Sequence, residues 1–191
     1  MRVITGSARG RKLAEPVKGC IRPTSDMVKE AIFSIVQFDI AGRRVLDLFA
    51  GTGQMGIEAA SRGASSVTFV DINVDAVKLI KTNLERCGLA GKVIMSDSLL
   101  FLDRCGQFDI IIIDPPFDSD LAAKSSEKIF KFDILSESGI MICETGRGVE
   151  LPAAAEPYAK GREYLYGKKK VTIYYGGKRP AHENGNISGE L

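Results

Sequence analysis

Short apolar runs alternate with segments of helical periodicity through the middle of this 191-residue chain. Between the runs, apolar residues recur every three or four positions, as Val77, Ile80 and Leu84 do, and this spacing predicts amphipathic helices. The runs themselves predict five strands, at residues 45–49, 67–70, 93–95, 108–113 and 140–143. Strands that alternate with helices predict an α/β, Rossmann-like fold built on a mostly parallel sheet.

The carboxy-terminal part of the chain has a different pattern. Two apolar runs, 164–166 and 171–175, are separated by Gly167 and three lysines, and they predict a terminal antiparallel strand pair. Residues 1–176 are therefore expected to form a single domain. The polar residues 177–191 are expected to be a disordered tail.

The amino-terminal part comes before the alternating units. Residues 2–17 alternate loosely and turn at residues 8–10, so we expect a basic β-hairpin extension within residues 1–20. A proline and several N-cap candidates then introduce a helix expected over residues 22–38, whose apolar positions fall on one face.

Charge is unevenly distributed, although the formal net charge is only +2. Residues 1–30 carry seven Lys or Arg against three acidic residues, and residues 160–170 carry five against one. Two basic segments at opposite ends of the chain predict a surface that binds a polyanion, with solvated surface hairpins as the alternative.

Composition excludes several kinds of chemistry. The single histidine, His182, lies in the polar tail, so histidine-based triads and H-E-x-x-H metal sites have no residue to use. The four cysteines are scattered without a C-x-x-C pair, which predicts neither a zinc site nor a disulfide framework and favours a reducing compartment. No apolar run approaches the roughly 20 residues of a membrane helix, and the start of the chain lacks an apolar signal core. We therefore expect a cytoplasmic protein with no metal and no membrane partner.

A glycine-rich loop follows the first strand. Asp47 lies in that run, and Gly51-Thr52-Gly53-x-x-Gly56 comes after it. Glycines let the backbone turn tightly and approach a ligand closely. The same pattern fits a dinucleotide fingerprint, in which Asp71 would bind the ribose of NAD. A tight turn without a ligand is the other alternative.

Two more carboxylates follow the second and third runs. Asp71 can accept hydrogen bonds from both ribose hydroxyls of an adenosine, and Asp97 from the adenine amino group. Each could instead cap a helix, since helical segments start at Asn73 and Ser98. As a pair in this order, the two carboxylates favour an adenosine-containing cofactor.

The most specific motif is Asp114-Pro115-Pro116-Phe117, directly after the fourth run. The prolines fix φ and leave carbonyl acceptors without N–H donors. The Asp114 carboxylate and the Pro115 carbonyl can hold the two hydrogens of an exocyclic base amine, on whose ring Phe117 can stack. That amine is a poor nucleophile, so positioning it in line with a sulfonium methyl group supplies much of the acceleration. The motif therefore favours methyl transfer over dehydrogenase chemistry, with a simple Pro-Pro turn as the alternative.

Together these motifs resemble the bacterial small-subunit ribosomal RNA guanine-N2 methyltransferase family known as RsmD. The likeness covers about residues 1–176. It rests on Met1 to Gly6 with Arg9 to Leu13, on Arg22-Pro23-Thr24, on residues 45–53, and on the Asp114 motif.

This resemblance implies an enzyme that uses S-adenosyl-L-methionine and forms N2-methylguanosine in 16S ribosomal RNA, within the small subunit or an assembly intermediate. Because no extra interaction segment is visible in the sequence, we expect a monomer. The implied cofactor site consists of Asp47, Phe49, Ala50, Gly51, Thr52, Gly53, Asp71, Ile72, Asp97 and Ser98. The implied catalytic residues are Asp114, Pro115, Pro116 and Phe117. The implied RNA contacts are Arg9, Arg11, Lys12, Arg22, Thr24, Lys168, Lys169 and Lys170.

Three other functions remain open at this point. A DNA adenine-N6 methyltransferase shares the Asp-Pro-Pro-Phe motif, but no segment of the chain is large enough for a domain that reads DNA sequence. An NAD-dependent oxidoreductase would use the glycine loop and Asp71. A non-enzymatic RNA-binding protein could have kept the fold.

Overall fold

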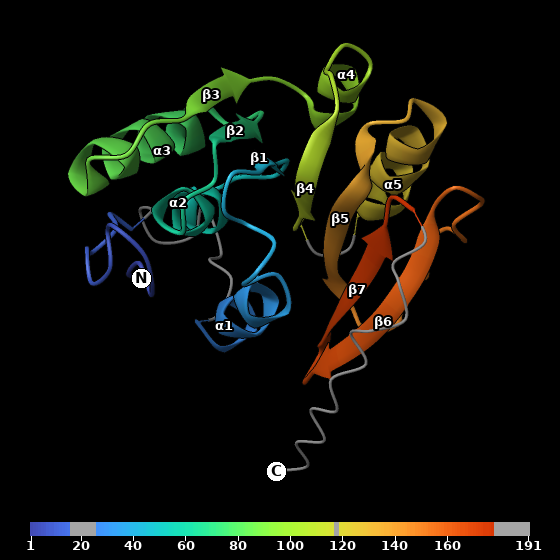
Figure 1. The fold of residues 1–191 in the computed structure, drawn as a ribbon. Coiled ribbons are helices and arrows are strands. Elements are labelled where there is room, and N and C mark those ends of the chain that lie inside the picture. Colours follow the sequence, from blue (N-terminus) through green and yellow to red (C-terminus); the bar gives the residue numbers. More distant parts are fainter. Residues whose placement is uncertain (16–25, 117–118, 178–191) are drawn as a thin grey trace.

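The computed structural model describes residues 1–15, 26–116 and 119–177 as a sheet with helices on both faces (Figure 1). The strands are β1 (Arg44–Asp47), β2 (Ser66–Asp71), β3 (Lys92–Met95), β4 (Phe108–Ile113), β5 (Leu135–Gly146), β6 (Ala159–Tyr166) and β7 (Lys169–Tyr175). The helices are α1 (Asp26–Ile35), α2 (Gln54–Ser61), α3 (Val74–Cys87), α4 (Ser98–Leu102) and α5 (Leu121–Lys131).

The sheet has the strand order β3-β2-β1-β4-β5-β7-β6. Strands β1 to β5 are mutually parallel, whereas β7 is antiparallel to both β5 and β6. The predicted parallel strands and the predicted antiparallel terminal pair are therefore confirmed. Because β1 to β5 are parallel, their carboxyl ends meet at one edge, which is where open α/β sheets bind ligands.

Side-chain alternation along the central strands divides the core into two layers. On one face, Val45, Ile112 and Ile142 pack with apolar residues of α1, α2 and α3. On the other face, Ile113 and Cys143 pack with apolar residues of α4 and α5. The middle strands are thus buried on both sides, as expected for a covered parallel sheet.

The amino-terminal segment is not the pair of strands that the sequence predicts. Residues 1–13 fold back on themselves, but within the described residues the only ladder element there is a single antiparallel bridge between Arg2 and Lys12. The reason is competition for backbone groups: the N–H groups of Ile4 and Thr5 donate to the Glu58 carboxylate of α2, at 2.8 and 3.0 Å. The segment is therefore docked on α2, and its own cross-strand pairing stays short: the Val3 and Leu13 N–H groups donate to the Arg11 and Met1 carbonyls on either side of the bridge.

Two helices differ from the sequence prediction. Helix α1 covers residues 26–35 of the expected 22–38, and residues 22–25 lie outside the described part. Helix α5 was not predicted, because its buried face includes Ser125 and Ser126 beside Ala122 and Ile129, which weakens the apolar period. Most of the expected tail also lies outside the described residues. Among the helices of the described chain, none is long and apolar enough to cross a membrane.

Candidate active site

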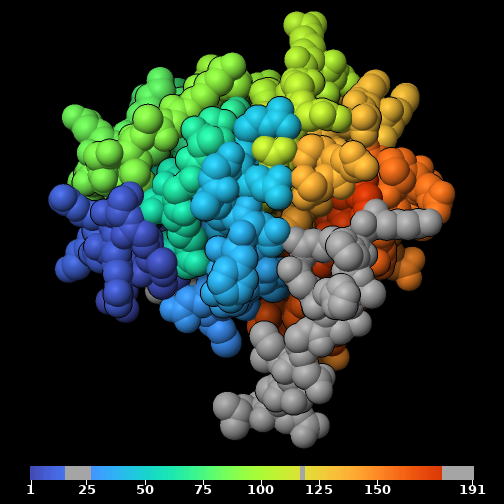
Figure 2. Space-filling view, viewed as in Figure 1, coloured from blue at the N-terminus to red at the C-terminus, as the bar shows by residue number. Residues whose placement is uncertain are grey.

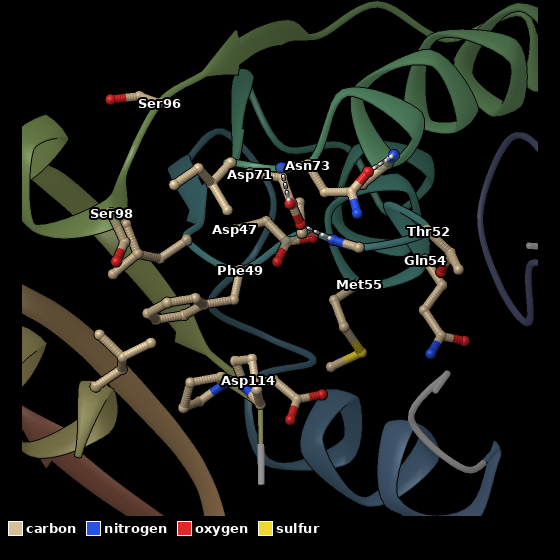
Figure 3. A pocket seen from close by; sticks show the side chains of 18 of the residues that line it. Asp47, Phe49, Thr52, Gln54, Met55, Asp71, Asn73, Ser96, Ser98 and Asp114 are labelled. Atoms are coloured by element: carbon tan, nitrogen blue, oxygen red, sulfur yellow. Dashed lines mark hydrogen bonds between the residues drawn. The ribbon is translucent and has the colours of Figure 1, made fainter. Parts of the chain in front are cut away.

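A pocket of about 500 Å³ opens at the carboxyl ends of β1, β2 and β4 (Figure 3). It brings together most of the residues predicted from strand ends and the glycine loop. Those that line it are Asp47, Phe49, Ala50, Gly51, Thr52, Asp71, Ile72, Asp97, Ser98, Asp114, Pro115 and Pro116. Gly53 is not among the lining residues, and Phe117 lies outside the described residues.

The glycine loop turns sharply between β1 and α2. Gly51 and Gly53 have φ of 53° and 76°, in the left-handed region that disfavours other residues. Gly56 serves the packing of α2 on β2, because a Cβ at this position would lie 2.3 Å from the buried Phe69 ring. The loop therefore has the backbone form of a ligand-binding turn, in which the third glycine permits close helix–strand packing.

Asp47 is buried beneath this loop, and its Oδ2 accepts the Gly56 N–H at 2.9 Å. Burial, together with the charges of Asp114 and Asp71, raises the pKa of Asp47 to about 7, although the hydrogen bond from Gly56 opposes the shift. Three carboxylates thus approach one pocket wall, where Figure 3 shows Asp47 between Asp71 and the Asp114 end. Such a wall favours a cationic ligand.

The two carboxylates after β2 and β3 have different local roles. Asp71 accepts the Gly51 N–H through Oδ2 and the Asn73 N–H through Oδ1, both at 2.8 Å, so it fixes the glycine loop. Helix α3 is capped by Asn73. Asp97 is itself the N-cap of α4, since its Oδ1 accepts the N–H groups of the next turn. Both carboxylates still line the pocket.

The Asp-Pro-Pro segment forms the end of the pocket away from β3. Asp114 is half-buried, Pro115 is buried and Pro116 is exposed. The Pro116 carbonyl accepts a hydrogen bond from Ser119 Oγ at 2.8 Å, which helps to hold the turn. On its far side the segment borders a second, much smaller cavity that Glu144 and Thr145 also line.

Sequence reasoning missed the role of two charged residues here. Lys169, expected among the RNA contacts, lines the large pocket and makes an ion pair with the buried Glu144. Lys170 is buried and pairs with Glu163, which leaves Lys168 as the exposed member of this lysine run. A usable signal was present for Glu144, because it directly follows the fifth apolar run as Asp114 follows the fourth.

The predicted RNA contacts in the amino-terminal segment are exposed. Arg9, Arg11 and Lys12 lie on the surface of residues 1–15, which Figure 2 shows in blue beside the green α3. Hydrogen bonds to Glu58 and Ser61 hold this segment on α2. Arg22 and Thr24 lie outside the described residues.

Comparison with known proteins identifies the family of this chain. A family model described as "Conserved hypothetical protein 95" matches residues 1–175. YlbH of Bacillus subtilis is 37% identical and aligns over 91% of this chain and 98% of its own length. A Haemophilus influenzae protein named "Ribosomal RNA small subunit methyltransferase D" is 35% identical over 76% of this chain and 78% of its own length.

A solved structure agrees on the fold. Escherichia coli yhhF matches with a TM-score of 0.84 at 27% identity, covering 93% of this chain and 98% of that chain. The mixed sheet with its antiparallel β7 is therefore a methyltransferase-like fold. By the family model and by similarity over most of its length, the chain belongs to the RsmD-like methyltransferase family described as Conserved hypothetical protein 95.

Proposed function

We propose that this protein transfers a methyl group from S-adenosyl-L-methionine to the exocyclic N2 amino group of a guanine in small-subunit ribosomal RNA. The observation that carries this proposal is the approach of Asp47, Asp71 and Asp114 to one pocket, with the pKa of Asp47 raised to about 7 by burial and by the other two charges. Mutual repulsion of this kind is relieved by a bound cation.

The pocket suits S-adenosylmethionine better than NAD. When bound, S-adenosylmethionine supplies an electrophilic methyl group on a positively charged sulfur, and it also carries an ammonium group. A pyrophosphate would need the free N–H groups at the amino terminus of α2. There the Asp47 carboxylate already accepts the Gly56 N–H, so a dinucleotide would bring its phosphates against a carboxylate.

The individual residues fit this cofactor. Asp47 would receive the ammonium group, because it is the buried carboxylate beneath the glycine loop. Asp71 would accept the ribose hydroxyls beyond β2, where its oxygens already orient the loop. Asp97 and Ser98 would meet the adenine beyond β3, with the exposed Ile72 covering the ring.

The acceptor base would lie at the Asp114 end of the pocket. The Asp114 carboxylate and the Pro115 carbonyl would accept the two N–H groups of the amine and raise the electron density on its nitrogen. Phe117, from the adjoining segment, would stack on the ring. A base bound in this way must first leave its stack in the RNA. The exposed Arg9, Arg11 and Lys12, with Lys168, would contact phosphates.

The test is methyl transfer from labelled S-adenosylmethionine to unmodified small-subunit RNA, as naked RNA and as assembled particles, with duplex DNA alongside. We expect N2-methylguanosine among the recovered nucleosides. N6-methyladenine from the DNA would refute the acceptor assignment and leave the cofactor assignment intact.

A variant tests the catalytic role separately. Asp114→Ala is expected to lower kcat by at least about a hundredfold, because it removes an acceptor aimed at the reacting amine, while S-adenosylhomocysteine still binds. Asp120→Ala is the matched control, since this nearby carboxylate, directly before α5, is 66% exposed and pairs with Lys124 of that helix. If Asp114→Ala lost cofactor binding and transfer equally, the role assigned to Asp114 would be wrong.

A further inference from the structure

Three charged side chains form a row across β4, β5 and β7 at the acceptor end of the pocket. Ile112 of β4 lies beside Ile142 of the parallel strand β5. On the other side of β5, Ile142 lies beside Ile173 of the antiparallel strand β7, and Glu144 lies beside Val171. Asp114 lies two residues after Ile112, and Glu144 lies two residues after Ile142. Since side chains alternate with a period of two, they continue the sheet face of Ile112 and Ile142.

Lys169 extends this row by one step along the same face, because it pairs with Gly146, two residues beyond Glu144. It lies two residues before Val171, whose side chain packs on that face, and its ammonium group makes an ion pair with Glu144. Lys169 and Asp114 both line the large pocket, whereas Glu144 and Asp114 both line the small cavity behind Pro115. The three head groups therefore border the space around the Asp-Pro-Pro segment.

Glu144 is the unusual member of the row. Its side chain is 2% exposed, and one oxygen accepts from Lys169. Its other oxygen, Oε2, is buried without a hydrogen-bond partner anywhere in the described chain. Burial and the neighbouring Asp114 charge raise the pKa of Glu144, and the Lys169 ammonium opposes this. A buried carboxylate oxygen without a donor is costly, so it points to a donor that arrives with a ligand.

We propose that Asp114, Glu144 and Lys169 together read the Watson–Crick edge of the extruded base and select guanine. This assignment rests on the proposed function, because it concerns the acceptor of the same methyl transfer. The row presents an acceptor, an acceptor and a donor. Guanine presents the complement along that edge: the N2 amino donor, the N1–H donor and the O6 acceptor.

Adenine does not match this row. Its amino group is a donor that could meet Asp114, but the neighbouring N1 is an acceptor and would face the Glu144 carboxylate. Two acceptors in contact leave both without a proton and repel each other. Glu144 would thus distinguish a guanine-N2 enzyme from an adenine-N6 enzyme, a distinction that the shared Asp-Pro-Pro-Phe motif does not make.

The experiment changes one edge of the base and one residue of the row. Once the methylated guanosine has been mapped, that position is replaced by 2,6-diaminopurine in ligated small-subunit RNA. This base keeps the N2 amine but has an acceptor at N1 and an amino donor in place of O6. We measure kcat/KM for both RNAs with the wild-type protein and with Glu144→Gln.

The wild-type protein is expected to prefer guanosine by at least about tenfold, the discrimination typical of a base-edge contact. Glu144→Gln is expected to reduce that preference by about tenfold, because a side-chain amide can donate to the acceptor at N1. Affinity for S-adenosylhomocysteine is expected to stay unchanged. Glu163→Gln is the matched control: Glu163 also pairs with a β7 lysine, Lys170, but lines neither cavity.

The outcomes separate the two proposals. N2-methylguanosine formation with a base preference that Glu144→Gln leaves unchanged overturns the base-reading role alone and identifies a structural ion pair. A wild-type protein that methylates no guanine N2 overturns the proposed function and this assignment with it. If Glu144→Gln is too unstable to purify, Glu144→Gln/Lys169→Met replaces both partners of the ion pair and is expected to reduce the preference for guanosine by at least about tenfold, and an unchanged preference would overturn the base-reading role.

Discussion

The buried Asp47 carboxylate is expected to make cofactor affinity depend on pH. In the free protein, burial and the charges of Asp114 and Asp71 raise the pKa of Asp47 to about 7 from its ordinary value near 3.8. The folded protein therefore keeps a proton that the unfolded chain has already lost, and the stability of the free protein falls as pH rises from about 4 to 7. A cofactor ammonium group favours the ionised carboxylate, so binding releases this proton.

The size of the effect follows from that pKa. One pH unit below it, about nine-tenths of the free protein is protonated at Asp47, so affinity for S-adenosylhomocysteine at pH 6 is expected to be about tenfold weaker than its plateau. Affinity is expected to rise with pH and level off above pH 7. Calorimetric titration in buffers of different ionisation enthalpy, between about pH 5.5 and 7.5, measures both the affinity and the protons released.

Two variants make the measurement specific. Asp47→Asn keeps an acceptor for the Gly56 N–H but does not titrate, so its affinity is expected to be independent of pH and to approach the wild-type value at low pH. Glu144→Gln removes the carboxylate at the small cavity, whose pKa burial also raises, and it is expected to keep the wild-type slope. A flat wild-type profile, or a slope that Asp47→Asn retains, would show that Asp47 does not receive the ammonium group.

Two further predictions concern stability and the amino-terminal segment. Gly56→Ala places a methyl group against the buried Phe69 ring and is expected to lower the free energy of unfolding in urea by about 1–3 kcal/mol. Gly148→Ala is the control, because the space around Gly148 is open. Equal stabilities of the two variants would contradict the packing role of Gly56. Glu58→Ala removes the acceptor of two backbone N–H groups and the ion-pair partner of Arg62. It is expected to lower the free energy of unfolding by about 3–5 kcal/mol, because it breaks a buried ion pair. Faster amide exchange at Ile4 and Thr5 and weaker RNA binding should follow, whereas the exposed Glu85→Ala should change neither.

The central strands could be predicted because they are buried on both faces and are therefore continuous apolar runs. Such runs can be recognised in the sequence without knowing which strands pair with them. The short extent of the amino-terminal hairpin could not be predicted, because the Glu58 side chain, more than 50 positions along the chain, takes the Ile4 and Thr5 N–H groups that a longer ladder could have used. Helix α5 was missed for a related reason. The hydroxyl of Ser126 donates to the Ala122 carbonyl within the helix, so a buried polar residue broke the period without disturbing the fold.

The residues of the site also differ in whether the sequence alone predicts them. Strand-end carboxylates such as Asp71 and Asp114 were predictable, since parallel strands bring their carboxyl ends to one edge whatever their order. Lys169 was not, because its position depends on the antiparallel register of β7 with β5. In sequence it is one of three adjacent lysines, all of which were expected to contact RNA phosphates. In the structure Lys168 lies in the exposed turn before β7, whereas Lys169 begins the strand and is paired at the pocket.

The amino-terminal segment is tied to the cofactor loop as well as to the surface. Asn83, buried on α3, accepts the Ala14 N–H at 2.6 Å and donates to the Ala14 carbonyl and, at 2.9 Å, to the Thr52 carbonyl of the glycine loop. Lys29 of α1, also buried, donates to the Arg2 carbonyl at 2.8 Å. A buried polar group destabilises the fold unless its hydrogen-bond partners stay in place. The positions of the amino-terminal segment, helix α1 and the glycine loop are therefore coupled through Asn83 and Lys29. The residues proposed to contact RNA phosphates are thereby held in a fixed position relative to the proposed methyl donor. Such a fixed position is needed to place a poorly nucleophilic amine in line with the methyl group.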